Sequence, residues 1–149
     1  MTAMKIVHTL SFAALAAMTL VGASQAQTPA KLAVVAHPSN AETKLTLEQV
    51  QDIYLGRTTI FPGGKRVVAV DQKDSSPSKG RFLELVLKRD AGQVKAHWSK
   101  LIFSGQGVPP AVVGADAEVK SWVARNPDAL GYLDASQADG SVKVLLTLP

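Results

Sequence analysis

Short apolar runs alternate with amphipathic stretches along most of this chain, and this alternation constrains its fold more than any other feature. Residues 31–36, which are all apolar after Lys31, form a short run that ends in a His-Pro-Ser-Asn turn signal, and this is typical of a buried strand. Further strand-like runs cover residues 66–70, 130–133 and 142–148. With the helical segments between them, the predicted order is β-α-β-α-α-α-β-β. Strands separated by helices favour an α/β fold with a mostly parallel central sheet flanked by helices.

The helical segments carry their own start and stop signals. Thr46, with Gln49 three residues later, predicts a capping box, and Gly56 supplies a stop. The other helices are expected over residues 79–89, residues 93–102 and residues 116–126, the last capped by Asp116. In the third of these four helices, one apolar stripe that includes Trp98 and Ile102 is expected to face the core. Residues 104–114, which contain several glycines and prolines, predict a long loop.

The first 26 residues predict a unit separate from the fold. A short basic start leads into an apolar run over residues 10–21, and small residues then stand at the positions that a signal peptidase reads. The run is too short and too weakly flanked to predict a membrane span. We therefore expect a signal peptide over residues 1–26, export to the periplasm, and one domain over residues 27–149 with no membrane span after cleavage.

Composition and motifs argue against several classes of function. The chain has no cysteine, so its fold must depend on an apolar core rather than on disulfides. Its formal net charge is only +4, and it has no basic block of the kind that binds nucleic acid. Metalloprotease, P-loop, nucleophile-elbow and redox-cysteine motifs are missing, and the histidines are scattered. We expect no catalytic residue, no metal, no cofactor and no nucleic-acid partner, and thus no enzyme.

The stretch DQKDSSPSKGRF, residues 71–82, is the best candidate for a binding site. It lies at the carboxyl end of a predicted strand and the amino end of a predicted helix, where open α/β sheets bind their ligands. The first turn of a helix also has free N–H groups and a partial positive charge. The hydroxyls of Ser76 and Ser78 could donate to an oxyanion there, and Lys79 or Arg81 could add positive charge.

A second interpretation of the same stretch is purely structural. Ser76 or Ser78 could simply cap the helix, with Pro77 beside it in the first turn. Asp71 and Asp74 lie among lysines, so they are expected to be solvated loop residues rather than a catalytic pair.

Four segments in a fixed order carry a resemblance to a known family. They are VVAHPSN, LTLEQVQDIYLGRTTIFPGGKRVVAVDQKDSSPSKGRF, AHWSKLIFSGQG and NPDALGYLDAS. Together they resemble the phosphate-type periplasmic substrate-binding proteins of ABC transporters, over nearly all of residues 27–149. The resemblance implies one lobe of a type 2 periplasmic-binding-protein fold, in a short form that lacks the other lobe.

The resemblance also implies which residues bind the ligand. The family's Ser-Gly-Thr-Arg anion loop falls on residues 76–79, so that Ser76, Ser78 and Lys79 would hold the anion and Arg81 would be peripheral. Two positions depart from the family pattern. A family arginine is replaced by Gln72, which removes a bidentate oxyanion donor, and the loop glycine is replaced by Pro77, which has no N–H.

The resemblance therefore predicts an exported protein that binds phosphate or a similar oxyanion for ABC-type uptake or sensing. Because the chain matches only one of two lobes, the missing wall of the site would come from an ABC permease or from a second copy of the chain. The alternative is a non-catalytic envelope module that keeps the lobe fold, binds no ligand tightly and contacts another protein.

Overall fold

Helices and strands alternate along residues 30–149, which are the residues that the computed structural model describes; the predicted signal peptide over residues 1–26 lies outside them. The elements are β1 (Leu32–Ala36), α1 (Leu47–Tyr54), β2 (Val68–Gln72), α2 (Pro77–Phe82), the π-helix η1 (Leu83–Leu87), α3 (Ala91–Phe103), β3 (Ala111–Gly114), α4 (Asp116–Arg125), β4 (Ala129–Asp134), the short 3-10 helix η2 (Ala135–Gln137) and β5 (Lys143–Leu148). Within residues 30–149, no helix is both long and apolar enough to cross a membrane.

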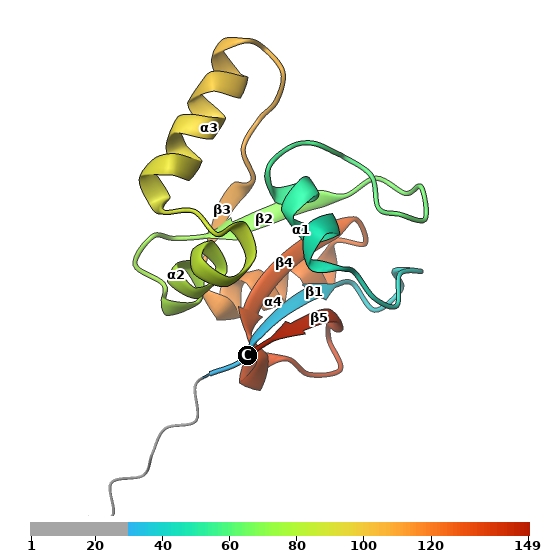
Figure 1. Cartoon of the computed structure of the whole chain (residues 1–149). Coiled ribbons are helices and arrows are strands. Elements are labelled where there is room, and N and C mark those ends of the chain that lie inside the picture. The colour runs from blue at the N-terminus through green and yellow to red at the C-terminus, as the bar shows by residue number, and fades with distance from the viewer. Residues whose placement is uncertain (1–29) are drawn as a thin grey trace, which may run out of the picture.

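The strands form one five-stranded sheet in the order β3-β2-β4-β1-β5 (Figure 1). β2 pairs in parallel with β3 and β4, whereas β1 pairs antiparallel with β4 and β5. The predicted α/β class with flanking helices is confirmed, but the sheet is mixed rather than mostly parallel. All five residues of β1 are buried, and an interior strand of a sheet covered on both faces has a continuous apolar sequence whether its neighbours are parallel or antiparallel.

β3 lies in a segment that was predicted to be a loop. Its four residues form an edge strand, and Ala111 and Val112 are both exposed. The segment therefore lacks the alternation of apolar and polar residues that would predict a strand. The strand forms because β2 offers a free edge, against which Ala111 pairs with Val70 and Val112 pairs with Asp71. Tertiary pairing, rather than local propensity, therefore makes this segment a strand.

The helices cover both faces of the sheet. On one face, α1, α2 and η1 pack over alternate residues of β1 and β4, and the core there includes Leu32, Val34, Val50, Ile53, Phe82, Val86, Leu130 and Tyr132. On the other face, α4 packs over the intervening residues, and the core includes Ala33, Val35, Val70, Val119, Val123, Ala129 and Leu133. The alternation along β1 and β4 divides the core into these two layers.

The helix boundaries follow local capping chemistry. The predicted capping box is confirmed: Thr46 Oγ1 accepts from the Gln49 N–H at 3.1 Å, and Thr46 N–H donates to Gln49 Oε1 at 2.9 Å. A second capping box, between Asp90 and Gln93, starts α3 two residues before the predicted start. Asp116 is the first residue of α4 rather than its cap, because Ala115 occupies the cap position.

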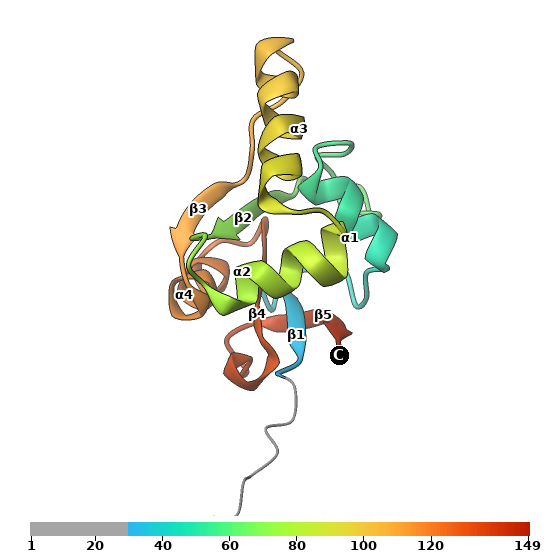
Figure 2. The ribbon, with the colours of Figure 1, turned by 60° about the vertical axis from the view of Figure 1, so that its left-hand side comes forward.

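α3 projects from the rest of the molecule (Figures 1 and 2). Trp98, which is 7% exposed, packs this helix against the rest of the molecule. Gly56, whose φ of +74° suits glycine, leaves room for the Trp98 ring, because a Cβ there would lie 2.6 Å from Trp98 Cη2. Beyond Trp98 the helix leaves the body, and Ile102 is 55% exposed. The prediction of one fully core-facing stripe along this helix is therefore wrong at its far end.

Candidate functional site

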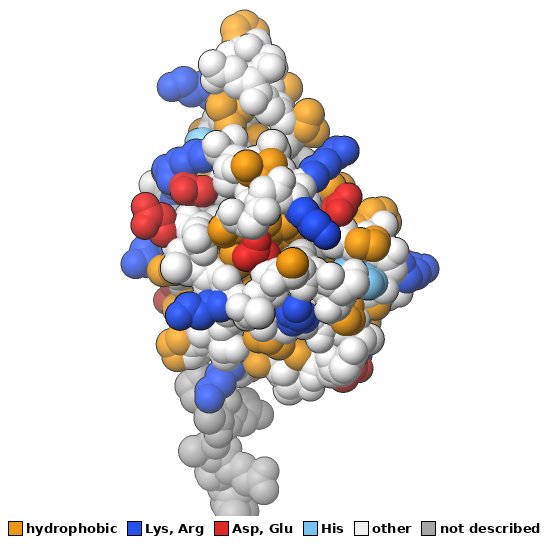
Figure 3. Space-filling model, turned by 90° about the vertical axis from the view of Figure 1, so that its right-hand side faces the viewer, with side chains coloured by type: hydrophobic (Ala, Val, Ile, Leu, Met, Phe, Trp, Pro, Cys, Tyr) orange, Lys and Arg blue, Asp and Glu red, His pale blue; other side chains and the backbone are white. Residues whose placement is uncertain are grey.

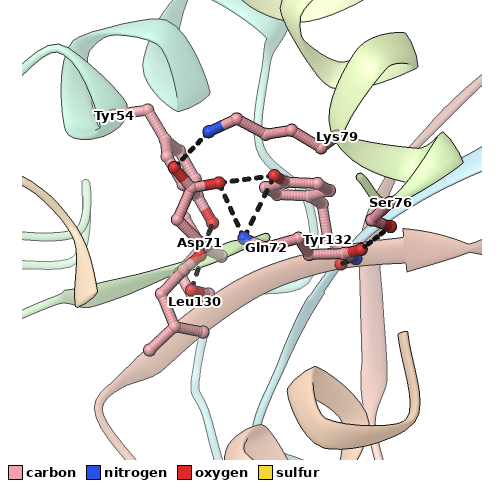
Figure 4. A network of polar contacts seen from close by, with 8 residues as sticks. Tyr54, Asp71, Gln72, Ser76, Lys79, Leu130 and Tyr132 are labelled. Carbon is pink, nitrogen blue, oxygen red and sulfur yellow. Dashed lines mark hydrogen bonds and ion pairs between the residues drawn. The ribbon is translucent and has the colours of Figure 1, made fainter. Parts of the chain in front are cut away.

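The end of β2 and the first turn of α2 form a buried polar region (Figure 4). Gln72, Ser76, Ser78 and Lys79 are all buried. Pro77 begins α2 and holds the preceding residue, Ser76, in an extended conformation. This sharp strand-to-helix turn brings polar residues inward that a solvated loop would leave in water.

Ser76 stands at the cap position of α2, but its hydroxyl makes no capping hydrogen bond. It donates instead to the side-chain oxygen of Gln72. The Gln72 amide nitrogen donates to Asp116 Oδ1 at 2.8 Å and to the carbonyl of Tyr132 at 2.7 Å. Where the resembled family has an arginine, this chain thus has a fully buried amide whose hydrogen bonds join β2, β4 and the start of α4.

Asp71 and Lys79 form an ion pair beside this amide. Their side chains are only 16% and 9% exposed, and Asp71 also accepts from the Tyr132 hydroxyl and, at 2.8 Å, from the Gln72 N–H. The expectation that Asp71 is a solvated loop residue is therefore wrong, whereas Asp74 is exposed as expected. Asp71 belongs to β2, which runs two residues further than the apolar pattern predicts.

The two remaining predicted site residues, Ser78 and Arg81, differ in their burial and in their hydrogen bonds. Ser78 is 4% exposed, and none of the side-chain hydrogen bonds within residues 30–149 involves it. Arg81 lies one turn further along α2, and its Nη2 donates to the backbone oxygen of Pro149. The structure therefore places Ser76, Ser78 and Lys79 together in the buried first turn and directs Arg81 elsewhere. In Figure 4, Lys79 extends toward Asp71 while Ser76 points toward Gln72.

Three aromatic rings pack together next to the polar region. Phe82 stacks on Tyr132 with ring centroids 3.9 Å apart, and Tyr54 packs edge-on against Phe82 at 4.6 Å. The Tyr54 hydroxyl donates to the carbonyls of Val70 and Leu130. Burial, and then the negative charge of Asp71, raise the pKa of both tyrosines well above their usual value. Both hydroxyls therefore stay protonated and act as donors.

The sequence pattern places Tyr132 only within the strand-like run over residues 130–133 and does not predict its hydrogen bond to Asp71. The available signal was a hydroxyl-bearing side chain inside an otherwise apolar strand, because a buried tyrosine needs a partner for its O–H. Within the described residues, no cluster of histidine, cysteine or carboxylate side chains could hold a metal ion.

Comparisons with known proteins place the fold. No protein-family model and no curated protein sequence matches the chain. Among solved structures, the chain is similar to a protein described as a phosphate ABC transporter substrate-binding protein from Clostridium perfringens, solved with bound phosphate (TM-score 0.63, 29% identity). It is also similar to an ABC-type phosphate transport receptor from Vibrio cholerae (TM-score 0.59, 25% identity). PstS from Borrelia burgdorferi shares the fold at 18% identity, with a TM-score of 0.59.

Each of these matches covers 78% of this chain but only 45–47% of the other protein. The chain thus has the fold of part of a phosphate-type substrate-binding protein and spans less than half of its length. These neighbours are binding proteins rather than enzymes. The resemblance and the fold class predicted from the sequence are confirmed at the level of the fold.

Proposed function

We propose that this chain is an exported substrate-binding protein, with residues 1–26 as its signal peptide, residues 27–149 as one binding domain and the periplasm as its location. It binds phosphate or a similar oxyanion at Ser76, Ser78 and Lys79, with Arg81 peripheral, for ABC-type uptake or sensing. The observation that carries the proposal is the buried, polar first turn of α2 in a fold shared with phosphate-binding proteins. No covalent bond is made or broken.

Ser78 and Lys79 would contribute most to binding. The Ser78 hydroxyl has no side-chain partner within residues 30–149, so it can donate to an oxyanion without breaking a hydrogen bond of the fold. The Lys79 ammonium has three N–H donors and can reach an anion while keeping one bond to Asp71. The nearby Asp71 carboxylate repels an anion, which favours modest affinity.

A complete site needs a second wall. Small-molecule sites in proteins bury most of the ligand surface. The solved neighbours are more than twice as long as the matched region, so one lobe leaves a bound anion partly in water. A second copy of the chain or an ABC permease would supply the missing wall.

Isothermal titration with phosphate, sulfate and arsenate tests the proposal. We expect phosphate to bind with a Kd below about 1 mM, equivalent to roughly 4 kcal/mol of binding free energy. The double variant Ser76→Ala/Ser78→Ala should abolish this heat. Ser99→Ala, an exposed serine on α3, is the matched control and should leave it unchanged. Silence at millimolar phosphate, with a normal circular dichroism spectrum, would refute anion binding.

The second candidate function is a non-catalytic envelope module that contacts another protein. It is favoured by the internal partners of the polar region, because Lys79 is paired with Asp71 and Ser76 with Gln72 before any ligand arrives. An anion site whose donors already have partners gains less on binding. The same titration separates the two functions, since the module predicts no heat with any of the three anions.

A further inference from the structure

A hollow lies at the base of α3, between this helix and β2. Its volume is about 550 Å³, and it is lined by the end of α1, the loop between α1 and β2, the start of β2, Trp98 of α3, and residues 108–111 of the segment that returns from α3 to β3. In Figures 1 and 2 this returning segment runs beside α3 down to the sheet. Small-molecule sites in proteins have volumes of about 300–1,000 Å³. The hollow is therefore large enough for a small organic ligand.

The walls of the hollow are mostly apolar, and several of them are held in place. The Trp98 ring lies against two glycines: a Cβ at Gly56 would lie 2.6 Å from its Cη2, and a Cβ at Gly107 would lie 3.3 Å from its Cζ3. On the returning segment, residues 109–110 are both prolines, whose φ is fixed by the ring. Val108, which is 84% exposed, lies next to them. An apolar ligand would thus meet walls that need little rearrangement to bind it.

Two polar side chains also line the hollow, and they come from neighbouring segments. The Val67 N–H donates to the Thr59 carbonyl at 3.0 Å, which places Thr59 beside Arg66. Arg66 carries the one charge among the lining residues, all of which belong to the part of the chain that the structure describes, and none of them is acidic. Within residues 30–149, the Arg66 guanidinium forms no ion pair and no side-chain hydrogen bond. The hollow thus combines apolar walls with one cation that has no partner in the fold.

We propose that this hollow binds a small carboxylate with an apolar body. The body lies between Trp98 and the returning segment, and the carboxylate accepts hydrogen bonds from the Arg66 guanidinium, whose planar fork of donors matches two carboxylate oxygens. An uncharged ligand would leave this cation without a partner, and a small inorganic anion would leave the apolar walls in water. The hollow lies beside the start of β2, whereas the proposed oxyanion site lies at the end of β2, and none of residues 76–79 lines the hollow. The two sites are therefore independent.

The charges around the hollow favour an anionic small molecule over a second copy of the chain. Residues 91–114 contain no aspartate and no glutamate. Seen from the side in Figure 3, apolar side chains lie below the projecting end of the molecule, and basic side chains lie on either side of them. If the exposed Phe103 of a second copy filled the hollow, Lys100, one helical turn before it, would approach Arg66. The same positive charges attract a carboxylate.

The indole N–H signals of the two tryptophans test the proposal. In a ¹H–¹⁵N correlation spectrum, Trp98 reports on the hollow, whereas Trp122 lies on α4, outside the hollow, and serves as an internal control. Trp122→Phe assigns the two signals. The probes are cyclohexanecarboxylate, the uncharged cyclohexylmethanol, and acetate, which has no apolar body.

The three probes separate the contribution of the charge from that of the apolar walls. We expect cyclohexanecarboxylate to shift the Trp98 signal with a Kd of about 1–10 mM, as suits so small a ligand, and to leave the Trp122 signal in place. Cyclohexylmethanol should bind about fivefold more weakly, because it cannot pair with Arg66. Acetate should not shift the Trp98 signal.

Two matched pairs of variants identify the groups responsible, and all four positions are exposed, so the fold should tolerate the changes. Arg66→Gln should raise the Kd of cyclohexanecarboxylate about fivefold and leave that of cyclohexylmethanol unchanged. Lys65→Gln, at a basic neighbour outside the hollow, should change neither. Val108→Ser should weaken both ligands about threefold, because it removes apolar surface from the wall. Val112→Ser, at a valine outside the hollow, should weaken neither.

Four results would overturn the proposal. They are a Trp98 signal that does not move at cyclohexanecarboxylate concentrations well above the expected Kd, equal shifts at both tryptophans, equal binding of cyclohexylmethanol, and an Arg66→Gln variant that binds the carboxylate normally. A Trp98 signal that moves with protein concentration in the absence of any ligand would also overturn it, and would assign the hollow to a second copy of the chain.

Discussion

At the scale of single residues, the polar region at the end of β2 stabilises its groups by pairing them inside the protein. Asp71 is held by Lys79, Tyr132 and its neighbour's N–H, and the amide of Gln72 has partners on both its atoms. Burying a polar group costs little folding free energy when each donor and acceptor has a partner, and it costs much more when one partner is removed. These hydrogen bonds and the ion pair therefore hold the first turn of α2 against β2 and β4.

The two tyrosines give a residue-scale prediction for alkaline pH. Tyr54 and Tyr132 are the only tyrosines of the chain, and burial together with the charge of Asp71 raises the pKa of each. Below pH 10 both states keep the proton. Above pH 10 the unfolded state loses it and the folded state does not, so folding stability falls by about 1.4 kcal/mol per pH unit per tyrosine. We expect tyrosinate absorbance and loss of circular dichroism to rise together in an alkaline titration.

Tyr132→Phe is the matched variant for this titration. It removes one of the two titrating hydroxyls, so the dependence of urea-unfolding stability on pH above 10 should become less steep than in the unmodified chain. Tyrosinate absorbance that titrates near pH 10 while the circular dichroism stays native would contradict the burial described above.

At the scale of elements, the contact between β4 and α4 depends on a missing side chain. A Cβ at Gly131 would lie 2.6 Å from Val119 Cγ1 and 3.1 Å from Val123 Cγ2. Gly131→Ala should therefore separate α4 from the sheet and lower the free energy of unfolding by about 1–3 kcal/mol, as overpacking in cores does. Urea unfolding measures this loss.

Gly140→Ala is the control for the Gly131 substitution. No atom lies within 4 Å of a Cβ built at Gly140, so this change should leave stability within about 0.5 kcal/mol of the unmodified chain. Equal effects of the two substitutions would mean that close packing of α4 on β4 is not the cause.

The sequence predicts that α3 is a helix, but it does not predict which of its residues pack against the rest of the molecule. The apolar spacing over residues 94–102 correctly predicts a helix, but periodicity tells which residues share a side and not whether anything packs against them. Trp98 packs over Gly56, whereas Ile102 and Phe103 extend past the rest of the molecule into solvent. The direction of α3, which points away from the sheet, decides this, and no local pattern encodes that direction (Figures 1 and 2).

At the scale of the whole molecule, the chain spans less than half of its solved neighbours. If a second copy supplies the missing wall of the proposed oxyanion site, binding and self-association are linked. We then expect phosphate at millimolar concentration to shift the sedimentation coefficient from monomer toward dimer, and Ser76→Ala/Ser78→Ala to abolish the shift. A monomer that binds phosphate without associating would leave a permease, or no second wall, as the remaining possibilities.

Local periodicity and capping chemistry are enough to predict the strand and helix segments that bury apolar residues, the first capping box, and the polar turn after β2. The sequence also carried enough linked motifs to predict the fold of the solved neighbours. Three features could not be predicted in this way: the sheet is mixed, Ala111–Gly114 is a strand, and Asp71 is buried against Lys79 and Tyr132. In each case the pairing, burial or ion pair is set by residues far apart in the chain, whereas periodicity reports only on neighbours along it.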